Sequence, residues 1–219
     1  MVFSAIKDRY TVRSFSDQDI SDAVLLDILE AGRLAPSWVN VQPWHFIVVR
    51  DKDTKELLSH VAHNQPHVAQ APVVIVCCGD SKSWERENYK QILESRPGIT
   101  EERVNALLNN PAFNPKLRGE EAVTCRTLEE LTYAIAYMTI EAETQGVGAC
   151  IVGYIGNELT ESIPDVYKQV RERLNLSDNI MMITLLLLGY PAPDLQKPPK
   201  NRRALEEIIS FEKYGNKKM

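Results

Sequence analysis

The sequence has no excess of positive charge and no long apolar run. Its 219 residues carry 25 lysines and arginines against 30 aspartates and glutamates, which gives a formal net charge of −5. Such a chain has no basic surplus to neutralise the phosphates of a nucleic acid, although a local pocket for one phosphate is still compatible with it. The longest apolar run, 180–188, is much shorter than the roughly 20 residues of a membrane-spanning helix. We therefore expect neither nucleic-acid binding nor a membrane span.

Cysteine is scarce and carries no recognisable motif. The four cysteines (Cys77, Cys78, Cys125 and Cys150) show no C-x-x-C spacing, and the N-terminal residues do not form a secretory signal. We therefore expect a reduced, cytoplasmic setting. Cys77 and Cys78 are adjacent in an apolar run, which predicts two small core residues on opposite faces of a strand rather than a redox pair.

Two catalytic signatures are missing. The only G-x-G, at 146–148, follows a predicted helix and precedes a predicted strand, which is the reverse of the dinucleotide-binding order, and the third glycine is absent. No Ser-His-Asp or paired-carboxylate constellation can be recognised either. These absences fit an enzyme in which a bound cofactor supplies the chemistry.

The residues that are present describe a globular α+β chain. Hydrophobic residues make up 44% of the sequence and charged residues 25%, which is typical of a folded domain. Apolar spacing predicts helices over 21–34, 54–63, 101–109, 127–145 and 164–174, and strands over 46–49, 71–79 and 181–188. We expect one domain over 1–219, interrupted by an irregular insertion at about 81–126. That insertion is either a lid over the site or a peripheral element without substrate contact.

One loop, Ala35-Pro36-Ser37-Trp38-Val39-Asn40-Val41-Gln42-Pro43-Trp44, stands out between a helix and a strand. Its prolines stiffen the backbone, and Ser37, Asn40 and Gln42 offer one hydroxyl and two carboxamides. Such groups can read the donors and acceptors along the edge of a planar heterocycle, for example a flavin. From the residues alone, an ordinary proline-rich connection with incidental polar residues is the favoured interpretation. We refer to 35–44 as the signature loop.

Two basic segments and one histidine group are further candidates. Arg9 and Arg13 flank Thr11, and Arg202 lies in a basic stretch near the C-terminus. Arginine forms forked, charge-assisted hydrogen bonds with phosphate, although solvated basic turns have the same appearance. The histidines have a spacing that could place three imidazoles on one helix face, but Pro66 interrupts that helix, so we expect no metal there. They are His60, His63 and His67.

The signature loop resembles that of the nitroreductase family, Ala-Pro-Ser-x-x-Asn-x-Gln-Pro-Trp. Residues 9–13 resemble the family's Arg-x-Ser-x-Arg, with Thr11 replacing serine, 146–153 resemble its Gly-Leu-Gly segment, and 202–207 resemble its closing motif. The resemblance extends from Arg9 to Glu207 in the family's order. It implies an α+β, nitroreductase-type fold with a mixed central sheet flanked by helices, built as an intertwined homodimer with FMN sites at the interface.

The resemblance also implies site residues. Arg13 would stabilise negative charge on the N1–C2 edge of the reduced flavin and is the expected catalytic group. The FMN-binding set implied by the family comprises Arg9, Tyr10, Thr11, Arg13, Pro36, Ser37, Asn40, Gln42, Gln65, Ile151, Val152, Gly153 and Arg202.

The implied activity is transfer of hydride from NADH or NADPH through flavin N5 to a small acceptor, such as a nitroaromatic or a quinone, by a ping-pong mechanism. Two alternatives remain open from the sequence. One is a specialised reaction on the same fold: dehalogenation, azoline oxidation or flavin fragmentation. The other is a flavin-binding protein without turnover.

Overall fold

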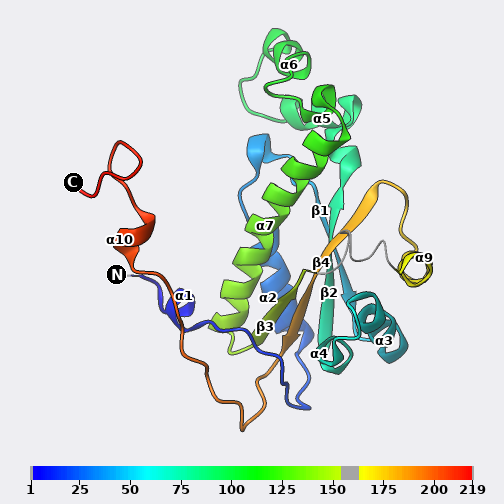
Figure 1. The fold of residues 1–219 in the computed structure, drawn as a ribbon. Helices are drawn as coiled ribbons and strands as arrows, with labels where there is room; N and C mark the ends of the chain where they lie inside the picture. The colour runs from blue at the N-terminus through cyan, green and yellow to red at the C-terminus, as the bar shows by residue number, and fades with distance from the viewer. Residues whose placement is uncertain (1, 154–162, 219) are drawn as a thin grey trace.

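The computed structural model describes residues 2–153 and 163–218, and shows a four-stranded sheet with helices on both faces (Figure 1). The strand order is β1-β2-β4-β3, and all three neighbouring pairs are antiparallel. The strands are β1 (Trp44–Val49), β2 (Val73–Asp80), β3 (Gly148–Val152) and β4 (Ile180–Gly189). This arrangement confirms the α+β class.

The expectation of a mixed sheet is wrong for these four strands. In the described residues, parallel pairing is limited to one isolated bridge, Thr11 with Ala149, where the N-terminal segment runs along β3. Buried strands read as continuous apolar runs, and such a run does not by itself determine strand direction. The direction is decided by which end of the sheet each connecting segment returns to.

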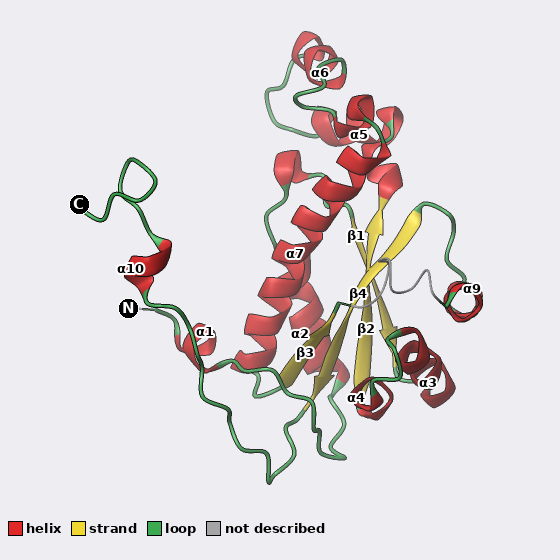
Figure 2. Cartoon of the chain, in the orientation of Figure 1, coloured by secondary structure: helices red, strands yellow, loops and turns green. Residues whose placement is uncertain are grey.

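The sheet divides the core into two apolar layers. On one face, α2 (Asp22–Arg33) and α7 (Glu120–Thr144) pack against β2 and β4, and this layer contains Cys77. On the other face lie α3 (Lys52–Val61), α4 (Pro66–Gln70) and α9 (Pro164–Arg173), and this layer contains Cys78 (Figure 2). The prediction that the adjacent cysteines point to opposite faces is therefore confirmed.

Local sequence signals explain several helix ends. Ser21 caps α2, because its hydroxyl oxygen accepts a hydrogen bond from the backbone N–H of Val24 at 3.3 Å. Gly146 follows the end of α7 with φ of 71°, the left-handed conformation that glycine adopts readily. The helix α7 starts at Glu120, seven residues before the predicted start, and is therefore 25 residues long. In the described residues, no helix has the length and apolarity needed to cross a membrane.

The insertion is helical and has its own apolar cluster. It contains the 3-10 turns η2 (Ser81–Trp84) and η3 (Pro115–Arg118) and the helices α5 (Arg86–Glu94) and α6 (Glu101–Leu108). The sequence indicated α6 but missed α5, whose buried residues are only Tyr89 and Leu93. The cluster also includes Val41, and Trp38 and Val39 pack against it. The insertion therefore packs directly on the signature loop.

Both ends of the chain lie outside the sheet-and-helix body. The N-terminal helix α1 (Ser4–Asp8) lies beside the last turns of α7, and α10 (Leu205–Ile208) stands away from the body (Figure 1). No residue of α10 is buried, and Leu205 is 62% exposed. We refer to residues 192–218 as the C-terminal arm.

One glycine holds the N-terminal segment against the sheet. A Cβ atom at Gly148 would lie 2.6 Å from Cγ2 of Val12, a branched side chain that cannot rotate away, whereas one at Gly153 would meet no atom within 4 Å. We expect Gly148→Ala to lower the free energy of unfolding by about 1–3 kcal/mol through overpacking, and the control Gly153→Ala to leave it nearly unchanged. Denaturant unfolding of both variants measures this. Equal stability of the two variants would contradict the tight contact.

Candidate functional site

The N-terminal arginine segment is fixed to the edge strand β3. The backbone N–H of Val12 donates to the carbonyl of Ala149 at 3.0 Å, and the Val12 side chain is buried above Gly148. This attachment brings Arg9 close to Ile151 and Gly153, although some 140 residues separate them in the sequence. Two of the predicted segments are therefore brought together by the fold.

A cavity of about 860 Å³ opens between α1, α7 and the ends of β3 and β4. Arg9, Ile151 and Gly153 line it, and the Ile151 side chain is half exposed there. Its apolar wall includes Leu131, Ile135, Ile140, Met182 and Ile183. Cofactor sites have this size and character, namely a mainly apolar surface with a few polar groups. An apolar wall with an arginine fits a flat ring system that carries an anionic tail, as FMN does.

Arg13 is exposed, lies beside Cys150 and near His67 of α4, and does not line the cavity. Burial raises the pKa of the Cys150 thiol, and the charge and hydrogen bonding of Arg13 partly oppose that rise. Burial also lowers the pKa of His67, and the positive charge of Arg13 lowers it further. Of the neighbouring candidates, Tyr10 has its ring 5.2 Å from the Lys197 ammonium group, and Thr11 forms the bridge to β3.

The signature loop is closed by its own polar side chains. The Ser37 hydroxyl oxygen accepts from the backbone N–H of Gln42 at 3.0 Å, and the Gln42 amide donates to the Asn40 side-chain oxygen at 3.1 Å. Val39, Asn40 and Gln42 have φ values of 48°, 62° and 47°. Positive φ is unusual for a β-branched residue such as Val39 and is found where the surroundings impose it, often at functional sites. Pro36 precedes this turn and is exposed.

A buried carboxylate anchors the loop to α7. The Glu130 side chain is 1% exposed, and its Oε2 accepts a hydrogen bond from the backbone N–H of Trp38 at 2.9 Å. Burial raises the pKa of Glu130, and the Trp38 hydrogen bond opposes this. Our reading of the sequence missed this residue. The available signal was a carboxylate on the buried face of a long helix, between Thr127 and Ala134, where an unpaired charge would be costly.

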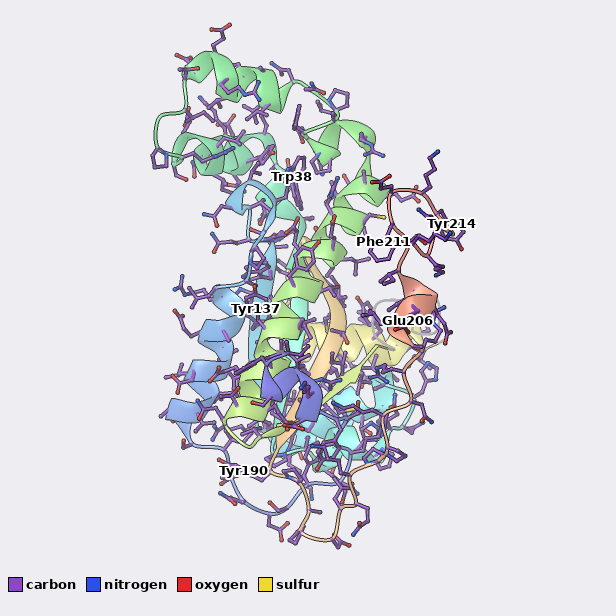
Figure 3. All side chains as sticks on the ribbon, turned by 90° about the vertical axis from the view of Figure 1, so that its left-hand side faces the viewer. Trp38, Tyr137, Tyr190, Glu206, Phe211 and Tyr214 are labelled. Carbon is purple, nitrogen blue, oxygen red and sulfur yellow. The ribbon has the colours of Figure 1, made fainter. Side chains whose placement is uncertain are left out.

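The predicted site has two halves, the arginine segment 9–13 and the signature loop, and the structure of one chain keeps them apart. Trp38 is held at Glu130, near the middle of α7, whereas Thr11 pairs with Ala149, beyond the C-terminal end of that helix. The 14 residues from Glu130 to the helix end correspond to about 21 Å along the axis. Trp38 and Tyr190 accordingly lie toward opposite ends of the molecule (Figure 3). One chain therefore does not place the signature loop against the arginine segment.

In the described residues, two further candidates form hydrogen bonds only within their own segments. Gln65 occupies the N-cap position of α4 without a capping hydrogen bond, and its side-chain amide donates to the Ala62 carbonyl at 3.0 Å. Arg202 is exposed in the C-terminal arm, and its guanidinium donates to the adjacent Asn201 carbonyl at 3.1 Å. Val152, the last of the predicted residues, is buried in β3, so its backbone rather than its side chain is available to a ligand. Across 2–153 and 163–218, no group of three His, Cys, Asp or Glu side chains has the geometry of a metal site.

Comparisons with known proteins agree on one protein family. Residues 6–190 match the model of the Nitroreductase family. A protein named NADH dehydrogenase from Thermus thermophilus is 30% identical over 206 residues, covering 94% of this chain and 93% of its own length. An FMN reductase [NAD(P)H] from Bacillus subtilis is 28% identical and covers 98% of this chain and 75% of its own. An iodotyrosine deiodinase from Nematostella vectensis is 25% identical, with 94% and 73% covered.

Solved structures agree on the fold. A nitroreductase-like protein from Streptococcus mutans superposes with a TM-score of 0.78 at 20% identity, covering 96% of this chain and 97% of its own. These matches describe a class of α+β oxidoreductases. The chain belongs to the nitroreductase family. The family resemblance and the nitroreductase-type fold predicted from the sequence are thereby confirmed.

Replacement of Glu130 tests the loop anchor. Because burial raises its pKa in the folded state, its ionised form is disfavoured there, and its contribution to stability decreases as pH rises above the ordinary value of 4.5. Glu130→Gln keeps a hydrogen-bond acceptor without the charge. We expect it to equal or exceed the wild type in free energy of unfolding at pH 7, with the difference shrinking toward pH 4.5.

The companion variant Glu130→Ala removes the acceptor and leaves the Trp38 N–H without a partner. We expect a loss of about 1–3 kcal/mol at pH 7. Denaturant unfolding of the three proteins at several pH values provides the measurement. If glutamine and alanine gave the same stability at every pH, the hydrogen bond would have no structural role.

Proposed function

We propose that this protein is an FMN-dependent oxidoreductase that passes electrons from NADH or NADPH to a small acceptor, such as a nitroaromatic or a quinone. Dependence on NAD(P)H and FMN agrees with the family and with relatives named FMN reductase [NAD(P)H] and NAD(P)H nitroreductase. The donor and the acceptor would use the same space in turn, which is a ping-pong order. The observation that carries the proposal is the apolar cavity that brings Arg9 together with Ile151 and Gly153.

The second part of the proposal is a homodimer whose sites draw on both chains. The signature loop is held near the middle of α7 and the arginine segment lies beyond the C-terminal end of that helix, so a second chain is needed to bring the two together. On the outer side of α7, Tyr133 and Tyr137 are 41% and 44% exposed, beside the exposed Leu128. The C-terminal arm carries Phe211 and Tyr214 away from the body (Figure 3). Apolar surface of this extent suits a large, obligate interface.

Each group has a distinct proposed role. Bound FMN supplies the two-electron chemistry, and the protein supplies position and electrostatics. Arg9 would neutralise the charge of the FMN phosphate, and Arg202 of the C-terminal arm would also bind that phosphate. Ser37, Asn40 and Gln42 of the partner's copy of the loop would meet the polar edge of the ring.

The remaining candidates complete the proposed site. Arg13 would place positive charge where negative charge develops on reduction. Tyr10, Thr11 and Gln65 would support the segments around it, and the backbone of Val152 would approach the ring. We also propose that 81–126 acts as a lid within a single domain, and that the protein works in a reduced, cytoplasmic setting with its four cysteines unpaired.

One specialised reaction deserves a parallel test. The similarity to an iodotyrosine deiodinase favours reductive dehalogenation among the alternatives. Assay of halophenols beside nitroaromatics and quinones, with the same purified protein, separates the two activities.

Cofactor content gives the first test of the function. We expect the purified protein to be yellow and to release FMN rather than FAD on heating, since the cavity offers arginine for one terminal phosphate. Anaerobic mixing with NADH or NADPH should bleach the flavin rapidly in a stopped-flow instrument. Slow or absent bleaching would favour a flavin-binding protein without turnover, and release of FAD would contradict the cofactor assignment.

Complementation tests the shared site. Arg9→Glu damages the arginine side, and Ser37→Trp blocks the signature loop, so each homodimer should be inactive. After the two are unfolded together and refolded, random pairing gives one intact site in every mixed dimer and about a quarter of the wild-type activity. Each variant refolded alone is the control. If activity did not recover and light scattering gave a monomeric mass, the proposal of a two-chain site would be contradicted.

A further inference from the structure

A second pocket, of about 350 Å³, lies where the insertion meets the signature loop. Trp38 and Val39 form the loop side, and the turn Arg96–Ile99 between α5 and α6 forms the opposite side. Arg103, Leu107 and Phe113 complete the lining. The pocket is separate from the larger cavity, with which it shares no lining residue. Its volume is at the lower end of the range of small-molecule sites and suits one substituted aromatic ring.

One wall of this pocket is aromatic and partly open. The rings of Trp38 and Phe113 are stacked, with centroids 6.4 Å apart and an interplanar angle of 29°. Phe113 is 36% exposed, whereas Trp84 behind Trp38 is fully buried. Arg126 lies over the Trp38 ring, 4.9 Å from its centroid, and fixes its orientation. A planar ligand could extend this aromatic stack at the pocket.

Two arginines of the pocket have no acidic partner. In the described part of the chain, the guanidinium groups of Arg96 and Arg103 form neither a salt bridge nor a side-chain hydrogen bond. Other arginines do find carboxylates: the pairs are Arg33–Glu30, Arg50–Asp22, Arg126–Glu129 and Arg173–Asp51. Two unpaired guanidinium groups at one small pocket attract a carboxylate or phosphate, which they can bind through forked hydrogen bonds.

The pocket is also linked to the signature loop by strained backbone. Val39 lines it with φ of 48°, and the adjoining Trp38 is held by buried Glu130. A β-branched residue keeps such a conformation only where its surroundings impose it. A ligand in the pocket would therefore change the backbone conformation at Asn40 and Gln42, the next polar residues of the loop.

We propose that this pocket selects electron acceptors that combine a planar conjugated ring with an anionic substituent, such as a nitrobenzoate or a carboxylated or phosphorylated quinone. The ring packs on Trp38 and Phe113, and the anionic group binds Arg96 and Arg103. This assignment deepens the FMN-dependent function proposed above and rests on it for turnover. In the proposed homodimer the signature loop meets the flavin held by the partner, so this pocket would adjoin the space that the donor leaves beside that flavin, although it is separate from the cavity of its own chain. The binding itself can be measured without turnover. An aromatic ring with an anionic group also occurs in NADPH, so the test includes the electron donor.

The direct test is equilibrium binding followed by quenching of tryptophan fluorescence. The probes are 4-nitrobenzoate and its neutral analogue 4-nitrobenzyl alcohol, and the proteins are the wild type, the double variant R96Q/R103Q, and R86Q as a control. Arg86 belongs to the same insertion but bonds Asn109 and does not line the pocket. We expect the double variant to bind 4-nitrobenzoate at least about tenfold more weakly, with less than about a twofold change for the alcohol. R86Q should behave as the wild type.

Further measurements make each outcome decisive. Trp38→Phe should remove most of the quenching, because only one of the three tryptophans, Trp38, lines the pocket. Equal wild-type affinity for the two probes, or quenching unaffected by Trp38→Phe, would overturn the proposal. So would a double variant that loses affinity for NADPH but keeps that for 4-nitrobenzoate, since the pocket would then serve the donor. Thermal melting of every variant verifies folding.

Turnover separates this proposal from the general function. With NADH as donor, the double variant should lose kcat/KM for 4-nitrobenzoate while keeping that for 4-nitrobenzyl alcohol. Absence of turnover with both acceptors in the wild type would contradict the proposed oxidoreductase function, and the fluorescence comparison would still decide the pocket.

Discussion

Close packing of α7 against the sheet is the constraint on which the rest of the molecule depends. Glycine permits this packing at Gly79 of β2, where a Cβ would overlap Thr127, and it permits equally close packing of α2 on α7 at Gly32, where a Cβ would lie 2.8 Å from Met138. The Thr127 hydroxyl then accepts the indole N–H of buried Trp84 at 2.9 Å, which ties the insertion to the same helix. The helix α7 thus covers one face of the sheet, holds the insertion and forms one wall of the large cavity.

The same helix keeps the signature loop and the arginine segment apart within one chain. Glu130 fixes the signature loop near the middle of α7, and the N-terminal arginine segment is fixed beyond the end of the helix through Val12 and Gly148. A rigid helix keeps these two anchors apart, because its length is set by backbone hydrogen bonding. In the homodimer proposed above, a second chain related by symmetry would bring the two segments together, and the exposed aromatic residues of α7 and the C-terminal arm would offer the surface for it.

Loop strain and buried charge act together at the signature loop. Three residues with positive φ are stable only because short hydrogen bonds close the loop and because a carboxylate, placed in the core at a cost, holds Trp38. The insertion packs on this loop through the cluster that includes Val41, and Thr124 of the insertion also lines the large cavity.

The sequence by itself determined the family, the α+β class, most helices and strands, and the opposite orientation of Cys77 and Cys78, because these follow from motif spacing and from short-range periodicity. Through the family resemblance it also indicated Arg9, Ile151 and Gly153 as members of one cofactor site, and these three residues line one cavity. Tertiary structure alone decided the antiparallel direction of all four strands, the anchoring of Trp38 by Glu130, and the pocket containing Arg96 and Arg103. The physical reason is the same in each case. Contacts between distant segments depend on where whole helices pack, and no local pattern of residues records that.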